Sequence, residues 1–294
     1  MEIIEVHAEI TNKCILECKH CSSLANRTNE ELSLEKLIKF IEQLSKNKRV
    51  RLTLTGGEPL LRFNLEELLE SLKKLNREIE LGLFTTGLIN EGNFIEPINL
   101  ERIRRLKELG LNFVFISIYS NEKKYHDEIT QVNLSFDKTI IAIKNFIEEG
   151  IETNINLPLM KFNIINLEKI INYLKSIGIN EIRLLRLINH GNANDNWQEI
   201  GITEEEQLKA IKMLESYSDK KITFGGFLEV MSCQYINNEK RCLAGRNKLY
   251  IDNYGDVYPC GAVKLNKKMK ICNIYEEYNL EKYNKSGSLC LAYN

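Results

Sequence analysis

The sequence predicts an α/β fold built around a parallel sheet. Three observations lead to this prediction: short runs of branched and aromatic residues alternate with amphipathic helical patterns, the strand precedes the helix in each repeat, and six such repeats follow one another. After about Ser218 the alternation stops, and the remaining segment holds five of the eight cysteines. We therefore divide the chain into an α/β domain over residues 1–217 and a small cysteine-rich module over residues 218–294.

The predicted strands are short and apolar, as expected of strands buried in a parallel sheet. They cover residues 5–11, 50–55, 80–85, 112–118, 153–159 and 181–187. Right-handed crossovers between six such units give an open doubly wound sheet, a barrel or a partial barrel. Six units are too few for a closed eight-stranded barrel, and in each of these folds functional residues gather at the carboxyl ends of the strands.

The helices follow from apolar residues at helical spacing and from their end signals. They cover residues 34–44, 65–75, 100–106, 135–149 and 167–177, and a sixth begins at 203. Ser33 is the expected N-cap of the first. Asn64 with Glu67, and Thr203 with Glu206, have the spacing of capping boxes.

Bulk composition is that of an ordinary globular protein, with 43% hydrophobic and 28% charged residues. Lys and Arg total 40 against 41 for Asp and Glu, so no net charge favours nucleic acid or a membrane surface. No apolar run reaches the length of a membrane span, and the N-terminus lacks the features of a secretory signal. We expect a cytoplasmic protein, in which cysteines serve metal binding or catalysis rather than disulfides.

The first motif is a run of three cysteines, Cys14, Cys18 and Cys21, directly after the first strand. Three thiolates in eight residues suit a cuboidal iron–sulfur cluster and leave its fourth iron without a protein ligand. Such an open position is typical of a catalytic site, whereas structural sites are closed. A zinc site completed by His20 or a distant cysteine stays open as an alternative.

The second motif is Gly56-Gly57-Glu58-Pro59, at the carboxyl end of the second strand. Consecutive glycines after a strand let the backbone approach a ligand closely. Taken alone, the motif is equally compatible with an ordinary turn before a helix.

Together the two motifs resemble the radical S-adenosylmethionine (SAM) superfamily over residues 4–215. The resemblance implies a partial (β/α)6 TIM-like barrel that binds a [4Fe-4S] cluster and SAM. The amino and carboxylate groups of SAM would chelate the open iron, and the loop from Gly56 through Glu58 and Pro59 would hold the amino group. The enzyme would then produce a 5′-deoxyadenosyl radical that abstracts hydrogen from a substrate.

The same resemblance assigns further residues to the cofactor. Thr85 and Thr86 correspond to a turn that contacts the ribose, and Ser117 to a position that commonly meets the cofactor. Apart from the resemblance, Arg183 and Arg186 on the sixth strand could each reach a carboxylate, and Arg186 is preferred because it lies nearer the carboxyl end. Tyr119 stands where many relatives have aspartate.

The C-terminal segment contains Cys242, Gly255 and Cys260 in a C-x12-G-x4-C pattern, and a hairpin turning near Gly255 would bring the two cysteines together. This resembles the opening half of SPASM and twitch modules, which hold auxiliary iron–sulfur clusters. The resemblance implies one auxiliary cluster, of the [4Fe-4S] type, on Cys242, Cys260 and Cys290, with Cys272 as a further ligand or a free thiol. A purely structural zinc module is the alternative.

Cys233 precedes this module, and three interpretations stay open: an inert buried thiol, a cluster ligand, or a catalytic thiol that donates a hydrogen atom, as in peptide epimerases of the superfamily.

The expected activity is modification of a ribosomally made peptide by epimerisation, cross-linking or oxidation. Oxidation or rearrangement of a small molecule such as a sugar, nucleoside or cofactor precursor is the first alternative. A non-enzymatic iron–sulfur or zinc protein is the second. Expected partners are an electron donor such as flavodoxin or ferredoxin and, because the first strand starts within a few residues of the N-terminus, a separate leader-peptide-binding protein.

Overall fold

The computed structural model describes residues 2–23, 30–92, 94–215, 222–225, 244–245 and 247–278. Three cysteines of the predicted sites, Cys233, Cys242 and Cys290, lie outside these residues.

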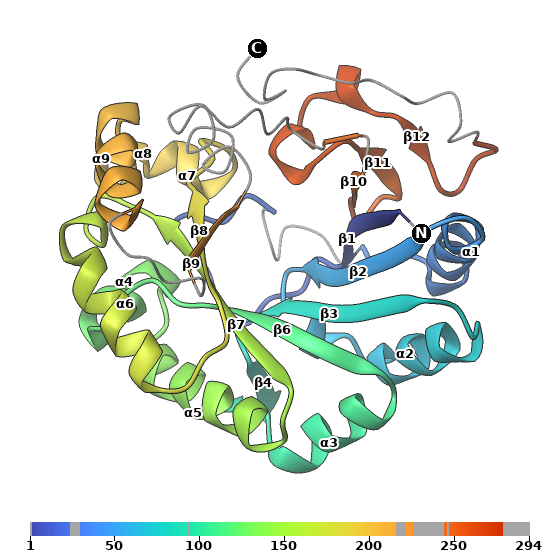
Figure 1. Cartoon of the computed structure of the whole chain (residues 1–294), viewed down its shortest axis with the longest axis horizontal. Coiled ribbons are helices and arrows are strands. Elements are labelled where there is room, and N and C mark those ends of the chain that lie inside the picture. Colours follow the sequence, from blue (N-terminus) through green and yellow to red (C-terminus); the bar gives the residue numbers. More distant parts are fainter. Residues whose placement is uncertain are drawn as a thin grey trace.

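The centre of the molecule is a ten-stranded sheet with the order β12-β11-β10-β1-β2-β3-β6-β7-β8-β9. The six predicted strands form its middle and pair in parallel, as expected. They are β1 (Ile3–Thr11), β2 (Arg49–Gly56), β3 (Ile79–Thr85), β6 (Leu111–Ser117), β7 (Glu152–Leu159) and β8 (Ile182–Arg186). The sheet is strongly curved, and its two edges are not joined through any described strand (Figure 1).

Helices cover the outer, convex side of this sheet (Figure 1). The six predicted helices are α1 (Leu34–Ser45), α2 (Leu65–Lys74), α3 (Leu100–Glu108), α5 (Ser135–Glu148), α6 (Leu167–Ser176) and α9 (Glu204–Glu215). The sequence patterns did not reveal α4 (Lys123–Thr130), α7 (Asn192–Asp195), α8 (Trp197–Ile200) or the antiparallel pair β4 (Leu88–Glu91) and β5 (Phe94–Pro97). Short 3₁₀ turns are η1 (Pro59–Leu61), η2 (Ile164–Asn166), η3 (Gly261–Val263) and η4 (Lys267–Met269). No described helix is long and apolar enough to cross a membrane.

Two of the three predicted helix caps are present. The Ser33 hydroxyl accepts from the Lys36 N–H, and Thr203 and Glu206 form a reciprocal capping box. The Asn64 capping box is wrong, because the Asn64 side chain makes no cap bond. Its Oδ1 instead accepts from Nε of the buried Arg62 at 2.9 Å.

The two faces of the sheet differ in chemistry. On β1, Ile4, Val6, Ala8 and Ile10 point outward into the main core beneath the helices. The alternate residues of the same strand, His7 among them, point to the inner, concave face, because successive side chains of a strand alternate. The outward face therefore supplies the packing that holds the fold, and the inner face is left for polar chemistry.

The inner face has an aromatic floor. Phe84, Phe113 and Phe115 pack edge to face, with ring centroids 5.6 and 5.9 Å apart. The guanidinium groups of Arg51 and Arg183 lie over Phe113 and Phe115, at 4.3 and 3.9 Å. These rings and cations fill part of the concave face of the sheet.

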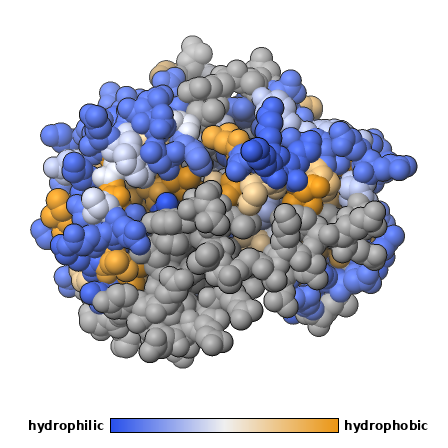
Figure 2. All heavy atoms as spheres, turned by 90° about the horizontal axis from the view of Figure 1, so that it is seen from above, coloured by the Kyte–Doolittle hydropathy of each residue, from blue (hydrophilic) through white to orange (hydrophobic). Residues whose placement is uncertain are grey.

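The described part of the C-terminal segment continues the sheet. It contains β9 (Ile222–Gly225), β10 (Lys248–Ile251), β11 (Asp256–Tyr258) and β12 (Cys272–Asn273). β10 pairs in parallel with β1, and β10 and β11 form the predicted antiparallel hairpin, with Gly255 at a φ of 81° in its turn. Strands from the two ends of the chain thus lie side by side (Figure 1). Seen from above, hydrophilic residues dominate the periphery and apolar residues show between them (Figure 2).

Candidate active site

The three cysteines of the first motif come together in the segment that follows β1, which we call the cluster loop (residues 12–23). Cys14, Cys18 and Cys21 belong to one apolar cluster with Leu16 and Leu88. Cys18 is buried, and the other two are partly exposed. The fold therefore gathers the three thiols at the carboxyl end of the first strand, where the sequence placed them.

The environment of these thiols disfavours free thiolates. Burial raises the pKa of Cys14 to about 12 and that of Cys18 well above its ordinary value, and the neighbouring Cys21 raises both further. Two buried thiolates side by side are unfavourable unless a metal compensates their charge. The residues thus fit an iron–sulfur cluster, which binds cysteines as thiolates.

A single metal ion fits less well. Among the residues the structure describes, no three His, Cys, Asp or Glu side chains converge closely enough to hold one ion. The ring of His20 packs edge-on against Tyr119 at 4.6 Å, and burial lowers its pKa to about 4. The zinc alternative with His20 as ligand therefore finds no support in this geometry.

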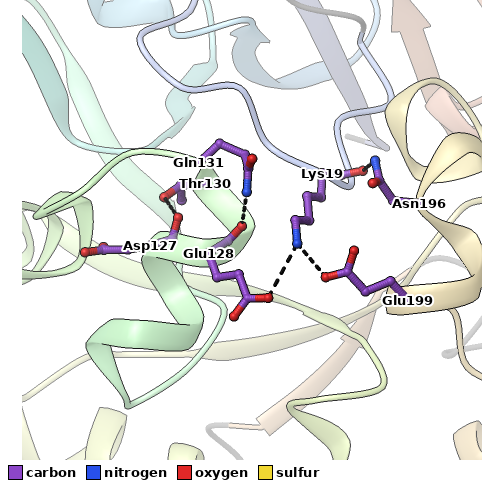
Figure 3. Close-up of polar contacts among 7 residues, drawn as sticks. All are labelled: Lys19, Asp127, Glu128, Thr130, Gln131, Asn196 and Glu199. Carbon is purple, nitrogen blue, oxygen red and sulfur yellow. Dashed lines mark hydrogen bonds and ion pairs between the residues drawn. The ribbon is translucent and has the colours of Figure 1, made fainter.

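Side chains from two later segments fasten the middle of the cluster loop (Figure 3). Lys19 reaches both Glu128 of α4, at 3.5 Å, and Glu199 of α8, at 2.5 Å. The Asn196 amide donates to the Lys19 carbonyl at 3.1 Å. Gln131 caps the end of α4 by donating to the Glu128 carbonyl.

Backbone bonds add to this attachment. Asn192 donates its side-chain amide to the Cys18 carbonyl at 3.1 Å and its N–H to the Cys21 carbonyl at 3.0 Å. The N–H of Lys19 donates to the Ile129 carbonyl. Sequence reasoning missed Asn192 and Asn196, although both lie in the polar stretch after the sixth strand, where a parallel sheet places functional residues.

The Gly56–Gly57 pair lies directly against the cluster loop. A Cβ atom on Gly56 would lie 2.2 Å from the Thr11 carbonyl oxygen, and one on Gly57 would lie 2.1 Å from that of Lys13. The N–H of Gly57 donates to Thr11 at 2.8 Å, and that of Glu58 to Lys13 at 2.7 Å. Only glycine permits this approach, which fixes the two sequence motifs to each other.

Glu58 connects the loop after β2 to the end of β3. Its carboxylate accepts from both hydroxyls of Thr85 and Thr86 at 2.6 Å, from the Thr86 N–H at 2.7 Å and from the Leu60 N–H at 3.1 Å. Burial raises the pKa of Glu58, and these hydrogen bonds oppose the shift. The threonine hydroxyls therefore hold Glu58, and Pro59 begins η1.

The remaining cofactor candidates also lie at strand ends. Ser117 ends β6 and Arg186 ends β8, and both are partly buried. Tyr119 is buried, and its hydroxyl interacts with Ser117 and with the thiol of Cys18. Burial raises the pKa of Tyr119 well above its usual range, so the phenol stays protonated beside the cysteine.

The two described cysteines of the C-terminal segment lie in different surroundings. Cys260 packs with Tyr250 and Tyr258 on the inner side of the hairpin, whereas Cys272 packs against the main core near Tyr278. On β12, Cys272 is paired with Val257, which points into the main core, so the two thiols face opposite sides of the hairpin. This favours the free-thiol interpretation of Cys272.

Comparisons with known proteins agree with this geometry. Residues 8–174 match the Radical SAM superfamily. A probable GTP 3′,8-cyclase of Sulfurisphaera tokodaii is 28% identical over 221 residues, which are 74% of this chain and 66% of that protein. A GTP 3′,8-cyclase of Aquifex aeolicus is 25% identical over 192 residues, or 63% and 57%. The chain thus spans less than two thirds of the length of either of these curated relatives.

Solved structures share the fold at low identity. SuiB of Streptococcus suis, bound to its precursor peptide SuiA, has a TM-score of 0.74 and 18% identity, over 96% of this chain and 65% of that one. anSMEcpe with bound AdoMet and a peptide has a TM-score of 0.72 and 17% identity, over 96% and 81%. Because the superfamily match covers more than half of the sequence, the chain belongs to the radical SAM superfamily and is an enzyme of that superfamily.

Proposed function

We propose that the cluster loop binds a [4Fe-4S] cluster through Cys14, Cys18 and Cys21 and that the enzyme cleaves SAM reductively. When bound, the cluster supplies the electron that splits SAM into methionine and a 5′-deoxyadenosyl radical. The chain's own residues bind and orient both groups and exclude water. The contact between the Gly57 backbone and the Lys13 carbonyl supports this proposal most directly, because it joins the cluster loop to the loop expected to hold SAM.

The N–H of Gly57 is already bonded to Thr11 at the end of β1, and that of Glu58 to Lys13 of the cluster loop. The backbone carbonyls of the Gly-Gly-Glu-Pro loop are therefore the groups that can accept hydrogen bonds from the amino group of SAM. Thr85 and Thr86 act by holding Glu58 and the adjoining turn, in addition to any ribose contact. Ser117 and Arg186 complete the proposed set at the ends of β6 and β8.

For the C-terminal segment we propose a twitch-like auxiliary cluster. Its proposed ligands are Cys260, which packs beside Tyr250 and Tyr258, together with Cys242 and Cys290. Cys233 remains a proposed hydrogen-atom donor.

The proposed substrate is a peptide. The similarity in fold to SuiB and anSMEcpe, both of which have been crystallised with peptides, supports this choice and extends over 96% of the chain. Electrons would come from a flavodoxin- or ferredoxin-like donor in the cytoplasm.

A nucleotide-like small molecule is the second candidate. Its support is the name of the curated relatives. The cations beside His7 on the inner face are each paired with a carboxylate and add no support.

The test is anaerobic reconstitution with iron and sulfide, followed by a strong reductant and SAM. We expect 5′-deoxyadenosine from the wild type, none from Cys18→Ala, and an unchanged yield from Cys272→Ala. Absence of 5′-deoxyadenosine from a wild type with full iron content would refute the proposal. Stimulation of the yield by candidate precursor peptides, but not by nucleoside triphosphates, would support the peptide over the nucleotide.

A further inference from the structure

A buried polar network connects β1, the cluster loop and the C-terminal segment. At its centre is Glu9, on the inner face of β1 and only 3% exposed. Its Oε1 accepts from the Ser23 hydroxyl at 2.5 Å, the Tyr250 hydroxyl at 2.6 Å and the Lys264 ammonium at 2.6 Å. Ser23 lies at the end of the cluster loop, Tyr250 on β10, and Lys264 directly after η3.

The network is closed on itself. Lys264 directs its ammonium to Glu9, to the Ser23 hydroxyl at 3.0 Å and to the Tyr250 hydroxyl at 3.5 Å, which uses all three N–H donors. The Ser23 and Tyr250 hydroxyls both donate to Glu9. Since each polar hydrogen is used within the group, the arrangement suits holding segments together better than binding a substrate.

Stability alone does not explain this pair. The Lys264 and Glu9 side chains are 6% and 4% exposed, and a buried ion pair is often no more stabilising than apolar residues of the same volume. Burial would raise the pKa of Glu9, but the charge of Lys264 and the three hydrogen bonds bring it below its ordinary value. The Glu9 carboxylate therefore stays charged at neutral pH, and removal of either partner of the ion pair leaves an uncompensated buried charge.

The network joins the two cysteine segments. Ser23 is two residues after Cys21, and Lys264 is four residues after Cys260. The ring of Tyr250 also packs against Gly261, where a Cβ atom would lie 2.8 Å from the ring. One buried ion pair thus fixes the exit of the cluster loop to the segment that begins at Cys260.

We propose that Glu9 and Lys264 are positioning residues that hold the cluster loop in register with the C-terminal segment. The importance of this position for catalysis rests on the proposed function, but the coupling itself does not. A change that increases amide hydrogen exchange in the C-terminal segment should also increase it in residues 12–23, and a change that slows exchange in the one should slow it in the other.

The experiment compares amide hydrogen exchange of the full-length protein with that of the double variant Glu9→Gln/Lys264→Met. This variant removes both charges and so leaves no unpaired buried ion, while the introduced amide oxygen still accepts from the Ser23 and Tyr250 hydroxyls. The control is Glu35→Gln/Lys39→Met, which removes a pair of the same 2.6 Å length whose side chains are 72% and 63% exposed. Exchange is followed in peptides from the cluster loop, from residues 247–264 and from β3 and β6.

We expect exchange in the double variant to rise about tenfold or more in the cluster loop and in residues 247–264, with β3 and β6 unchanged. The control should match the wild type throughout. In the reconstituted enzyme, the KM for SAM should rise more than kcat falls. Unchanged exchange in the cluster loop would overturn the proposal, and so would a uniform rise that includes β3 and β6, because that indicates a general loss of stability.

The exchange measurement needs no turnover. If the wild type produced no 5′-deoxyadenosine but the cluster loop still responded to the double variant, the coupling would stand and the proposed function would fail.

Discussion

One carboxylate oxygen of Glu58 accepts hydrogen bonds from both the hydroxyl and the backbone N–H of Thr86, at 2.6 and 2.7 Å. This contact fastens the loop after β2 to the turn after β3 at the carboxyl edge of the sheet. The Thr85 hydroxyl donates a hydrogen bond to the other carboxylate oxygen, at 2.6 Å. The acid of the Gly-Gly-Glu-Pro motif therefore has a clear structural role in shaping the proposed SAM site.

Replacing Glu58 by Gln should weaken this connection. An amide offers one acceptor oxygen where the carboxylate offers two, and its NH₂ group would face a hydroxyl or N–H that now lacks an acceptor. We expect the free energy of unfolding to fall by about 2 kcal/mol, measured by urea denaturation, and the yield of 5′-deoxyadenosine to fall with it. Glu67→Gln, at an exposed position on α2, is the matched control and should change neither.

Gly57→Ala should separate the two motifs. The new methyl group would lie 2.1 Å from the Lys13 carbonyl oxygen, so the loop after β2 must move away from the cluster loop. We expect the rate of SAM cleavage to fall on the order of 100-fold, as for other small misplacements at an active site.

Gly92→Ala is the comparison for Gly57→Ala. Gly92 has a φ of 63° and open space around it, so alanine there costs about 1 kcal/mol of stability and no activity. Equal activity of the two variants would contradict the proposed role of the Gly57 contact.

The iron content of cysteine variants should show which cysteines bind an iron–sulfur cluster. If both proposed clusters form, Cys18→Ala and Cys260→Ala should each lose about four irons per chain. Cys272→Ala should lose none, because its thiol packs against the main core rather than beside Cys260. Iron and acid-labile sulfide assays after anaerobic reconstitution give the result, and a loss of iron in Cys272→Ala would revive Cys272 as a ligand.

Asp252 should impose a pH dependence on stability. Its pKa is raised from 3.8 to about 6, first by burial and then by the nearby carboxylates of Asp256 and Glu9. Between about pH 4 and pH 6 the Asp252 carboxyl thus binds a proton in the folded chain that it has released in the unfolded chain, so the contribution of Asp252 to the free energy of unfolding falls as pH rises and levels off above pH 6.

The variant Asp252→Asn still accepts the N–H groups of Tyr254 and Asp256 but does not titrate. In urea denaturation across this pH range, the difference in free energy of unfolding between the variant and the wild type should shift in favour of the variant as pH rises, because only the wild type loses the contribution of Asp252. The exposed Asp195→Asn should leave the wild-type dependence intact. Parallel curves for Asp252→Asn and the wild type would contradict the assignment.

Local patterns were sufficient to predict most of the fold. The six parallel strands and the first helix cap follow from periodicity and from residues such as Ser33, whose effects act within one element. The Asn64 capping box failed because Arg62, two residues earlier, engages its side chain. Arg62 is held in place by the carbonyls of Ile10 and Leu32, and these distant contacts are not visible in a run of four residues.

The six strand–helix units, the three clustered cysteines and the glycine motif are each encoded within a few neighbouring residues, so they could be predicted from the amino-acid sequence. Which distant groups meet depends on the folded arrangement of the strands. It brought Lys264 to Glu9, Asn192 to the cluster loop, and Cys260 and Cys272 to opposite sides of one hairpin. The contact of Lys264 with Glu9 depends on the register of β10 beside β1, and that register is selected by packing across the whole sheet.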